Sequence, residues 1–163
     1  MELFEAIAKR YSCRDLKPAE IPRGDLERIL DAGRRAASGK NIQPFSFLVL
    51  TAAKDIEKIA TAQAFIAKAS AIIAIVADPE KSPYWLEDIS AAAQNMLLAI
   101  TAMGYGCTWV EGTTLPKEPE FKDYLGIPQH LRLMIFLPIG QPALPGSQKP
   151  KKSLSTMVHW QEW

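Results

Sequence analysis

Apolar residues recur at helical spacing in several parts of the chain and predict where its helices lie. The longest such stretch repeats Ile89, Ala93, Met96, Ile100 and Met103, which is typical of a central core helix. A shorter stretch at the start of the chain places Leu3, Phe4, Ile7 and Ala8 on one face. The pattern predicts helices over residues 2–9, 25–37, 54–68, 83–103 and 118–125.

Continuous apolar runs predict the strands. The run "SAIIAIVAD" is apolar at both alternating sets of positions, as expected of a strand buried on both faces. "FSFLVL", "HLRLMIFLPIG" and a short piece of "GYGCTWVEG" predict further strands, and "SGKNIQP" predicts a loop. Helices and strands are intermingled, which indicates an α+β or α/β fold with one sheet covered by helices.

The last part of the chain differs in composition. Residues 141–163 contain three prolines and a glycine, which predict an extended arm, and they finish with Trp160 and Trp163. Exposed indole rings leave a large apolar surface in water, so we expect this arm to dock. The sequence leaves open whether it docks on its own chain or on a partner.

The length, net charge and cysteine content of the chain argue against several classes of protein. With 163 residues, 48% of them hydrophobic, we expect a single domain over residues 1–163. A net charge of +1 argues against a nucleic-acid or membrane-surface binder. Cys13 and Cys107 lie outside any C-x-x-C spacing and predict neither a zinc site nor a disulfide framework. No signal peptide or membrane span is predicted, so we expect a soluble protein of the reducing cytoplasm.

The stretch "RYSCR" places Arg10, Ser12 and Arg14 at alternating positions. In an extended segment these side chains line one edge over about 13 Å, with Tyr11 and Cys13 on the opposite side. Guanidinium and hydroxyl groups suit phosphate oxygens, so the spacing fits an elongated ligand with a phosphate at one end and a polar ring at the other. The alternative is a surface loop whose arginines pair with nearby acids such as Asp15.

Three other segments carry polar groups that suit such a ligand. In each case an ordinary structural explanation remains open: a helix-to-strand turn, a strand-end turn, or a solvated basic run. The candidates are Ser38, Asn41 and Gln43 in "ASGKNIQPF", Gly112 with its accessible N–H in "TWVEG", and Lys149, Lys151 and Lys152 in the arm.

The sequence lacks the common cofactor-binding and catalytic motifs. "GYGCTW" lacks the third glycine of a dinucleotide-binding fingerprint, and there is no P-loop. His130 and His159 are the only histidines, and neither has a metal-ligand spacing. With no evident nucleophile or base, any redox chemistry must come from a cofactor.

Four segments in this order resemble those of the nitroreductase family of FMN flavoproteins: "RYSCR", "ASGKNIQPFSF", "DISAAAQNMLLAITAMGYGCTWVEG" and "KKSLSTMVHW". The resemblance spans nearly the whole chain. It implies an α+β fold with a central mixed or antiparallel sheet flanked by helices. It also implies a homodimer with exchanged C-terminal arms, with FMN at the dimer interface held by residues from two copies.

The resemblance also implies roles for individual residues. Arg10 and Ser12 would hold the phosphate, and Arg14 would lie near the ribityl chain and the N1/C2-carbonyl edge of the flavin. The remaining expected cofactor-binding residues are Tyr11 in the same segment, Ser38, Asn41 and Gln43 against the ring, Glu111 and Gly112 whose backbone faces flavin N5, and Lys151 and Lys152 at the phosphate.

The activity implied is transfer of hydride from NADH or NADPH to flavin N5, and on to a nitroaromatic or quinone, in a ping-pong cycle. No side chain is expected to be catalytic, and no metal is expected. Phe45 and Lys40 depart from the family pattern and leave the acceptor open. Two alternatives remain: a flavin carrier or redox sensor without turnover, and a small interaction module whose arginines are surface charges.

Overall fold

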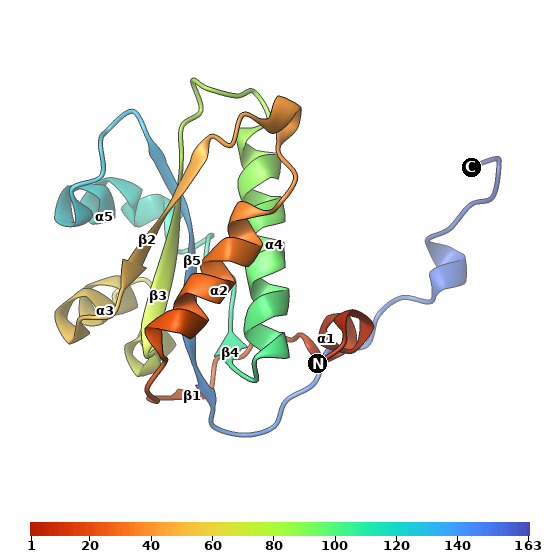
Figure 1. Cartoon of the computed structure of the whole chain (residues 1–163), viewed down its shortest axis with the longest axis horizontal. Helices are drawn as coiled ribbons and strands as arrows, with labels where there is room; N and C mark the ends of the chain where they lie inside the picture. Colours follow the sequence, from red (N-terminus) through yellow and green to blue (C-terminus); the bar gives the residue numbers. More distant parts are fainter.

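The computed structural model describes all 163 residues and shows an antiparallel sheet covered by helices on both faces (Figure 1). The strands are β1 (Leu16–Lys17), β2 (Phe45–Leu50), β3 (Ala71–Ala77), β4 (Gly106–Cys107) and β5 (Arg132–Pro142). The α-helices are α1 (Leu3–Lys9), α2 (Arg23–Arg34), α3 (Ala53–Ala60), α4 (Trp85–Ala102) and α5 (Glu118–Leu125). The predicted α+β class is confirmed, and all strand pairings within the chain are antiparallel rather than mixed.

Strand β3 lies at the centre of the sheet, between β2 and β5. In this register Ile73 lies opposite Val49 on β2 and Leu137 on β5. The strand order is β1-β5-β3-β2, and the short β4 also pairs with β5. Strand β2 has a single neighbour, so the backbone groups along its outer edge have no strand partner.

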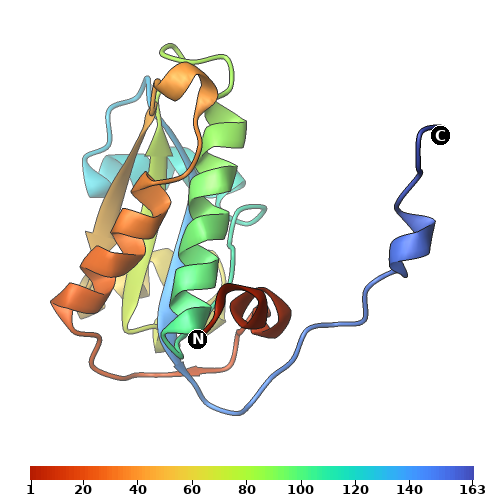
Figure 2. The same cartoon turned by 45° about the vertical axis from the view of Figure 1, so that its right-hand side comes forward.

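All seven residues of β3 are buried because helices pack on both faces of the sheet. Ile73 and Ile75 belong to the core formed with α2 and α4, whereas Ile72 and Ala74 belong to the core formed with α3 and α5. Figure 2 shows α2 and α4 on one side of the sheet and α3 and α5 on the other. Full burial of each isoleucine contributes roughly 1.5–3 kcal/mol. The double-sided apolar pattern of this strand was therefore interpreted correctly from sequence.

Helices α2 and α4 pack closely where a glycine faces a methionine. A Cβ built on Gly33 would lie 2.1 Å from Cε of Met96, so a larger residue would force Met96 to move. Next to this contact, Asn95 Nδ2 donates to the carbonyl of Ala32 at 3.1 Å. This bond satisfies a carbonyl near the C-terminal end of α2 and ties the two helices together.

The predicted helix over residues 54–68 is wrong in its second half. Helix α3 ends at Ala60, and a separate 3-10 turn covers Ala64–Lys68. The hydroxyl of Thr61 donates to the carbonyl of Lys58 at 2.9 Å, which competes with continuation of the helix. Gln63 is then extended, with φ −153° and ψ 125°.

The predicted start of the long helix is also wrong. The sequence pattern predicts a helix from residue 83, but α4 begins at Trp85. The Ser82 hydroxyl instead accepts a hydrogen bond from the N–H of Tyr84 at 3.1 Å, which forms a turn ahead of the helix. The predicted core positions of this helix are correct, since Ile89, Met96 and Ile100 are fully buried.

Helix α1 has the predicted apolar residues, but its own chain does not cover them. Only Ala6 is buried, against α4, while Leu3, Phe4 and Ile7 are 61%, 83% and 45% exposed. Helix α1 lies beside the C-terminal end of α4, at the outside of the molecule (Figure 2). No helix of the chain is both long and apolar enough to cross a membrane.

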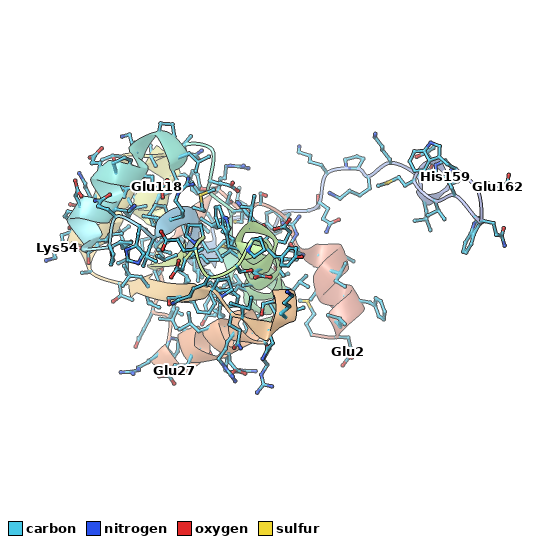
Figure 3. The ribbon with its side chains drawn as sticks, turned by 90° about the horizontal axis from the view of Figure 1, so that it is seen from above. Glu2, Glu27, Lys54, Glu118, His159 and Glu162 are labelled. Carbon is cyan, nitrogen blue, oxygen red and sulfur yellow. The ribbon has the colours of Figure 1, made fainter.

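The chain after β5 runs away from the body of the molecule. Residues 143–163 form an extended segment with one 3-10 turn at Leu154–Thr156 (Figure 1). Figure 3 shows His159 and Glu162 near its far end, well separated from the helices and sheet. Trp160 and Trp163 are 82% and 102% exposed, so these indole rings have no docking site on their own chain.

Replacement of Gly33 by alanine tests the close approach of α2 and α4. We expect Gly33→Ala to lower the free energy of unfolding by about 1–3 kcal/mol, because the added methyl displaces the buried Met96. Gly24→Ala in the same helix is the control, since its Cβ would meet nothing within 4 Å. It should leave stability unchanged or raise it by up to about 1 kcal/mol through helix propensity. Equal denaturation midpoints for the two variants would contradict this account.

Candidate functional site

A pocket of about 250 Å³ lies between the segment after α1 and the beginning of the arm. Its lining contains four cations and no acid. The lining residues are Arg10, Tyr11, Ser12, Arg14, Ser147, Gln148, Lys149 and Lys151. A pocket of this composition attracts an anion, because several charge-assisted hydrogen bonds are available within a small volume.

Strand β4 and Thr108, the residue that follows it, fix the orientation of the Arg10–Arg14 segment. The N–H of Cys13 donates to the carbonyl of Cys107 at 2.9 Å, and the hydroxyl of Thr108 donates to the carbonyl of Cys13 at 2.6 Å. Cys13 is buried, so the alternating side chains of Arg10, Ser12 and Arg14 face outward. The structure therefore brings these three predicted residues together at one pocket.

The alternative explanation for the arginines was pairing with nearby acids. No salt bridge of the chain includes Arg10 or Arg14. Asp15 instead lies 3.8 Å from Nζ of Lys68. The two guanidinium groups are thus free to bind a ligand.

Tyr11 does not face the interior with Cys13, as the alternation predicted. It is half-buried and lines the pocket, and its ring lies against Gly146, where a Cβ would be 2.2 Å from Cε2 of the tyrosine. Burial, together with the nearby thiol of Cys13, raises the pKa of Tyr11 to about 12. The phenol therefore remains neutral at physiological pH and adds no negative charge to the pocket.

The arm contributes lysines to the pocket of its own chain. Gln148 Nε2 donates to the carbonyl of Ile7 at 2.7 Å, which ties the beginning of the arm to α1. Lys149 and Lys151 line the pocket, whereas Lys152 does not. Of the two lysines expected at the phosphate, Lys151 lies at this pocket and Lys152 does not, and their binding to a phosphate stays a prediction. The alternation of an extended arm could have favoured Lys149 over Lys152.

Ser38, Asn41 and Gln43 lie in a loop at the other end of the molecule. The backbone of Lys40, Asn41 and Gln43 is left-handed, with φ of 52°, 57° and 54°. Ser38 Oγ accepts from the N–H of Gln43 at 3.2 Å, and Gln43 Nε2 donates to the carbonyl of Asn41 at 3.0 Å. The side chains of Ser38 and Gln43 thus help to close the loop itself, and the side chain of Asn41 has no hydrogen-bond partner.

One chain does not bring this loop and the cation pocket together. The loop lies beside the beginning of α4, whereas helix α1, which leads into the pocket-lining residues Arg10–Arg14, lies near the C-terminal end of α4 (Figure 1). The helix has 18 residues and is therefore about 27 Å long. The two groups of residues therefore lie at opposite ends of α4 within one copy of the chain.

Glu111 and Gly112 follow directly from the segment that pairs with Cys13. Val110 exchanges hydrogen bonds with Phe136 on β5, and Glu111 accepts from the indole N–H of Trp109 at 2.8 Å. The N–H of Gly112 donates to no group of the chain, and a Cβ there would meet nothing within 4 Å. The protein's own packing therefore does not require glycine at this position, which is consistent with close approach of a ligand.

The described side chains offer binding groups rather than reactive ones. No cluster of three or more metal-ligating side chains is present. Cys13 and Cys107 are buried, and burial raises the pKa of the Cys107 thiol. A buried, protonated thiol is a poor nucleophile.

An uncovered apolar surface adjoins the cation pocket. Helix α1, which leads directly into Arg10, exposes Leu3, Phe4 and Ile7. A shallow groove of about 420 Å³ lies between α1, α2 and α4, with Leu98 and Ala99 in its lining. Apolar surfaces of this kind mark sites of interaction.

Comparison with known proteins places these features in a family. The model of the Nitroreductase family matches residues 7–71 and 60–141. A relative from Archaeoglobus fulgidus, provisionally named NADH dehydrogenase/NAD(P)H nitroreductase, is 34% identical over 151 residues, which cover 86% of each chain. A solved structure from Bacteroides thetaiotaomicron with the same provisional name has a TM-score of 0.91 and 27% identity, and covers 99% of this chain and 98% of that one. An FMN-dependent nitroreductase from Clostridium difficile has a TM-score of 0.89, with 23% identity and coverage of 98% and 99%.

Proposed function

Because the chain belongs to the nitroreductase family, we propose that it is an FMN-dependent oxidoreductase that passes electrons from NADH or NADPH to a small acceptor, such as a nitroaromatic or a quinone. One observation carries this proposal: a pocket with four cations and no acid adjoins a segment that ends in the free N–H of Gly112. This combination suits a ligand with a phosphate and a polar ring.

The charges of the pocket fit the phosphate of FMN. This group carries nearly two negative charges and favours several charge-assisted hydrogen bonds. Arg10, Ser12, Lys149 and Lys151 would hold it, and Tyr11 would remain a neutral neighbour. Arg14 would lie toward the ring, where a cation stabilises negative charge on the reduced flavin.

The N–H of Gly112 would donate to the ring at N5, with Glu111 held in place by Trp109. FMN, when bound, supplies the chemistry by accepting hydride from the nicotinamide and delivering it to the acceptor. The residues of this chain bind and orient; none is proposed as a general acid or base. The acceptor class follows from the family.

We further propose that two copies of the chain build each site. Ser38, Asn41 and Gln43 lie too far from the cation pocket of their own chain, so those of the partner would contact the ring. The exposed apolar faces of α1 and α4 adjoin the pocket and would be buried between the copies. The arm would then cross to the partner and bury its tryptophans there.

The first test is the visible spectrum of the purified protein. We expect a yellow protein, or one reconstituted by added FMN, that is bleached by NADH or NADPH under anaerobic conditions and reoxidised by a quinone or nitroaromatic. A flavin carrier or sensor would bind FMN but show no useful turnover with these acceptors. A protein that stays colourless in excess FMN would refute the proposal.

Replacement of Arg10 tests the phosphate pocket. Arg10→Ala should weaken FMN binding by about 1.5–3 kcal/mol, because it removes a charged hydrogen bond. This corresponds to roughly a ten- to hundredfold rise in Kd, measured by flavin fluorescence titration. Arg28→Ala is the control, since Arg28 lies on the exposed face of α2, 74% exposed and 3.9 Å from Asp25. Equal Kd values for the two variants would exclude Arg10 from the site.

Truncation of the arm separates its two proposed roles. Deletion of residues 147–163 removes both the lysines and the tryptophans, so we expect loss of the dimer and of FMN together. Deletion of residues 158–163 keeps Lys149 and Lys151 and should weaken the dimer while each remaining dimer still binds FMN. Light scattering and flavin content measure the two effects. A dimeric, yellow protein after the longer deletion would rule out an exchanged arm.

A further inference from the structure

Asp88 is a buried carboxylate that the proposed function does not yet use. It lies in the first turn of α4 and is 3% exposed. No salt bridge of the chain includes it. Burial of an acid without a cation is unfavourable, although the N-terminal end of a helix offsets part of this cost. The hydrogen bonds that this carboxylate accepts must therefore offset the cost of its burial.

The carboxylate binds the beginning of the 38–43 loop. Oδ1 accepts a hydrogen bond from the N–H of Gly39 at 2.8 Å, and Oδ2 lies 3.5 Å from the hydroxyl of Ser82. A Cβ on Gly39 would lie 2.5 Å from Cδ2 of Tyr84. Gly39 is thus held between the carboxylate and the tyrosine ring.

The other hydrogen bonds of the loop are internal. Asn41 and Ile42 donate to the carbonyls of Ser38 and Gly39, and Gln43 bonds to Ser38 and Asn41. From Ser38 to Gln43, the bond to Asp88 is the only hydrogen bond that ties the loop to the rest of the chain. Loss of that bond would leave the loop without a polar anchor.

The loop needs an anchor because its backbone is strained. Three residues other than glycine are left-handed: Lys40, Asn41 and Gln43. Such conformations are unfavourable for residues with a side chain and persist only where the surroundings enforce them. An unanchored loop would relax and re-aim the side chains of Lys40 and Asn41, both of which are exposed and without partners.

We propose that Asp88 is a positioning residue for the reaction: by holding Gly39 it fixes the left-handed loop and so presents Asn41 to the flavin ring of the partner's site. This inference rests on the proposed function. Asp88 itself touches neither cofactor nor substrate and acts through the backbone of Gly39. Ser82 and Tyr84 complete the same anchor.

The first measurement requires no cofactor. Lys40 is exposed at the tip of the loop, so the rate of trypsin cleavage after Lys40 reports how well the loop is held. Asp88→Ala should be cleaved at least about tenfold faster than the original protein, because the opened loop fits a protease site more readily. Asp88→Asn keeps an acceptor oxygen for Gly39 and should be cleaved at close to the original rate. Glu87→Ala, which removes an exposed acid from the same turn, is the matched control.

The second measurement is steady-state kinetics of the FMN-loaded protein. Asp88→Ala should keep FMN bound, because the cation pocket lies toward the other end of α4, but it should lower kcat/KM by roughly tenfold or more. Asp88→Asn should restore most of this loss, and Glu87→Ala should match the original protein. A merely structural role would lower stability without this rescue pattern in kcat/KM.

The outcomes separate this inference from the proposed function. If the protein binds no FMN, the proposed function fails, and with it the role of Asp88 in the reaction, while the trypsin result still decides whether Asp88 anchors the loop. If FMN binds but Asp88→Ala matches Glu87→Ala in both measurements, the inference alone is overturned. Faster cleavage with unchanged kcat/KM also overturns the positioning role. If Asp88→Ala does not fold, slow hydrogen exchange of the Gly39 amide in the original protein supports the anchor, and rapid exchange refutes it.

Discussion

Helix α4 determines which polar groups of a single chain can lie close together. Its 18 residues span about 27 Å, with the 38–43 loop beside its beginning and helix α1, which leads into the cation pocket, near its C-terminal end. Ile89, Met96 and Ile100 are fully buried, so the helix cannot bend or shift without disturbing the core. Under the proposed function, the polar groups at the two ends would act on one ligand across an interface between two copies.

The parts of the fold with one dominant pattern could be predicted from sequence. Strand β3 is apolar at every position because it is buried on both faces, and the period of α4 reflects a helix with one continuous buried stripe. The errors occurred where local hydrogen bonds compete with the pattern. Thr61 ends α3 through its own hydroxyl, and Ser82 forms a turn before α4 instead of capping it. Neither competition is visible in hydrophobic periodicity.

The candidate site was predictable to a similar extent. The outward direction of Arg10, Ser12 and Arg14 follows from alternation about a buried Cys13, which the sequence indicated. The position of Tyr11 against Gly146 depends on the path of the arm, and the anchoring of Gly39 by Asp88 joins residues far apart in sequence. Both are tertiary contacts without a local signature. Whether the expected residues bind FMN stays a prediction.

The arm gives a physical reason to expect assembly and cofactor binding to be coupled. Its first part places Lys149 and Lys151 on the cation pocket, and its last part carries Trp160 and Trp163 into solvent. If a partner surface buries the indole rings, the same segment of chain is held at both ends, and the lysines lose less conformational freedom when they bind a phosphate. A phosphate held by the lysines would in turn orient the arm toward the partner. Each event then favours the other by the same free energy, as linkage requires.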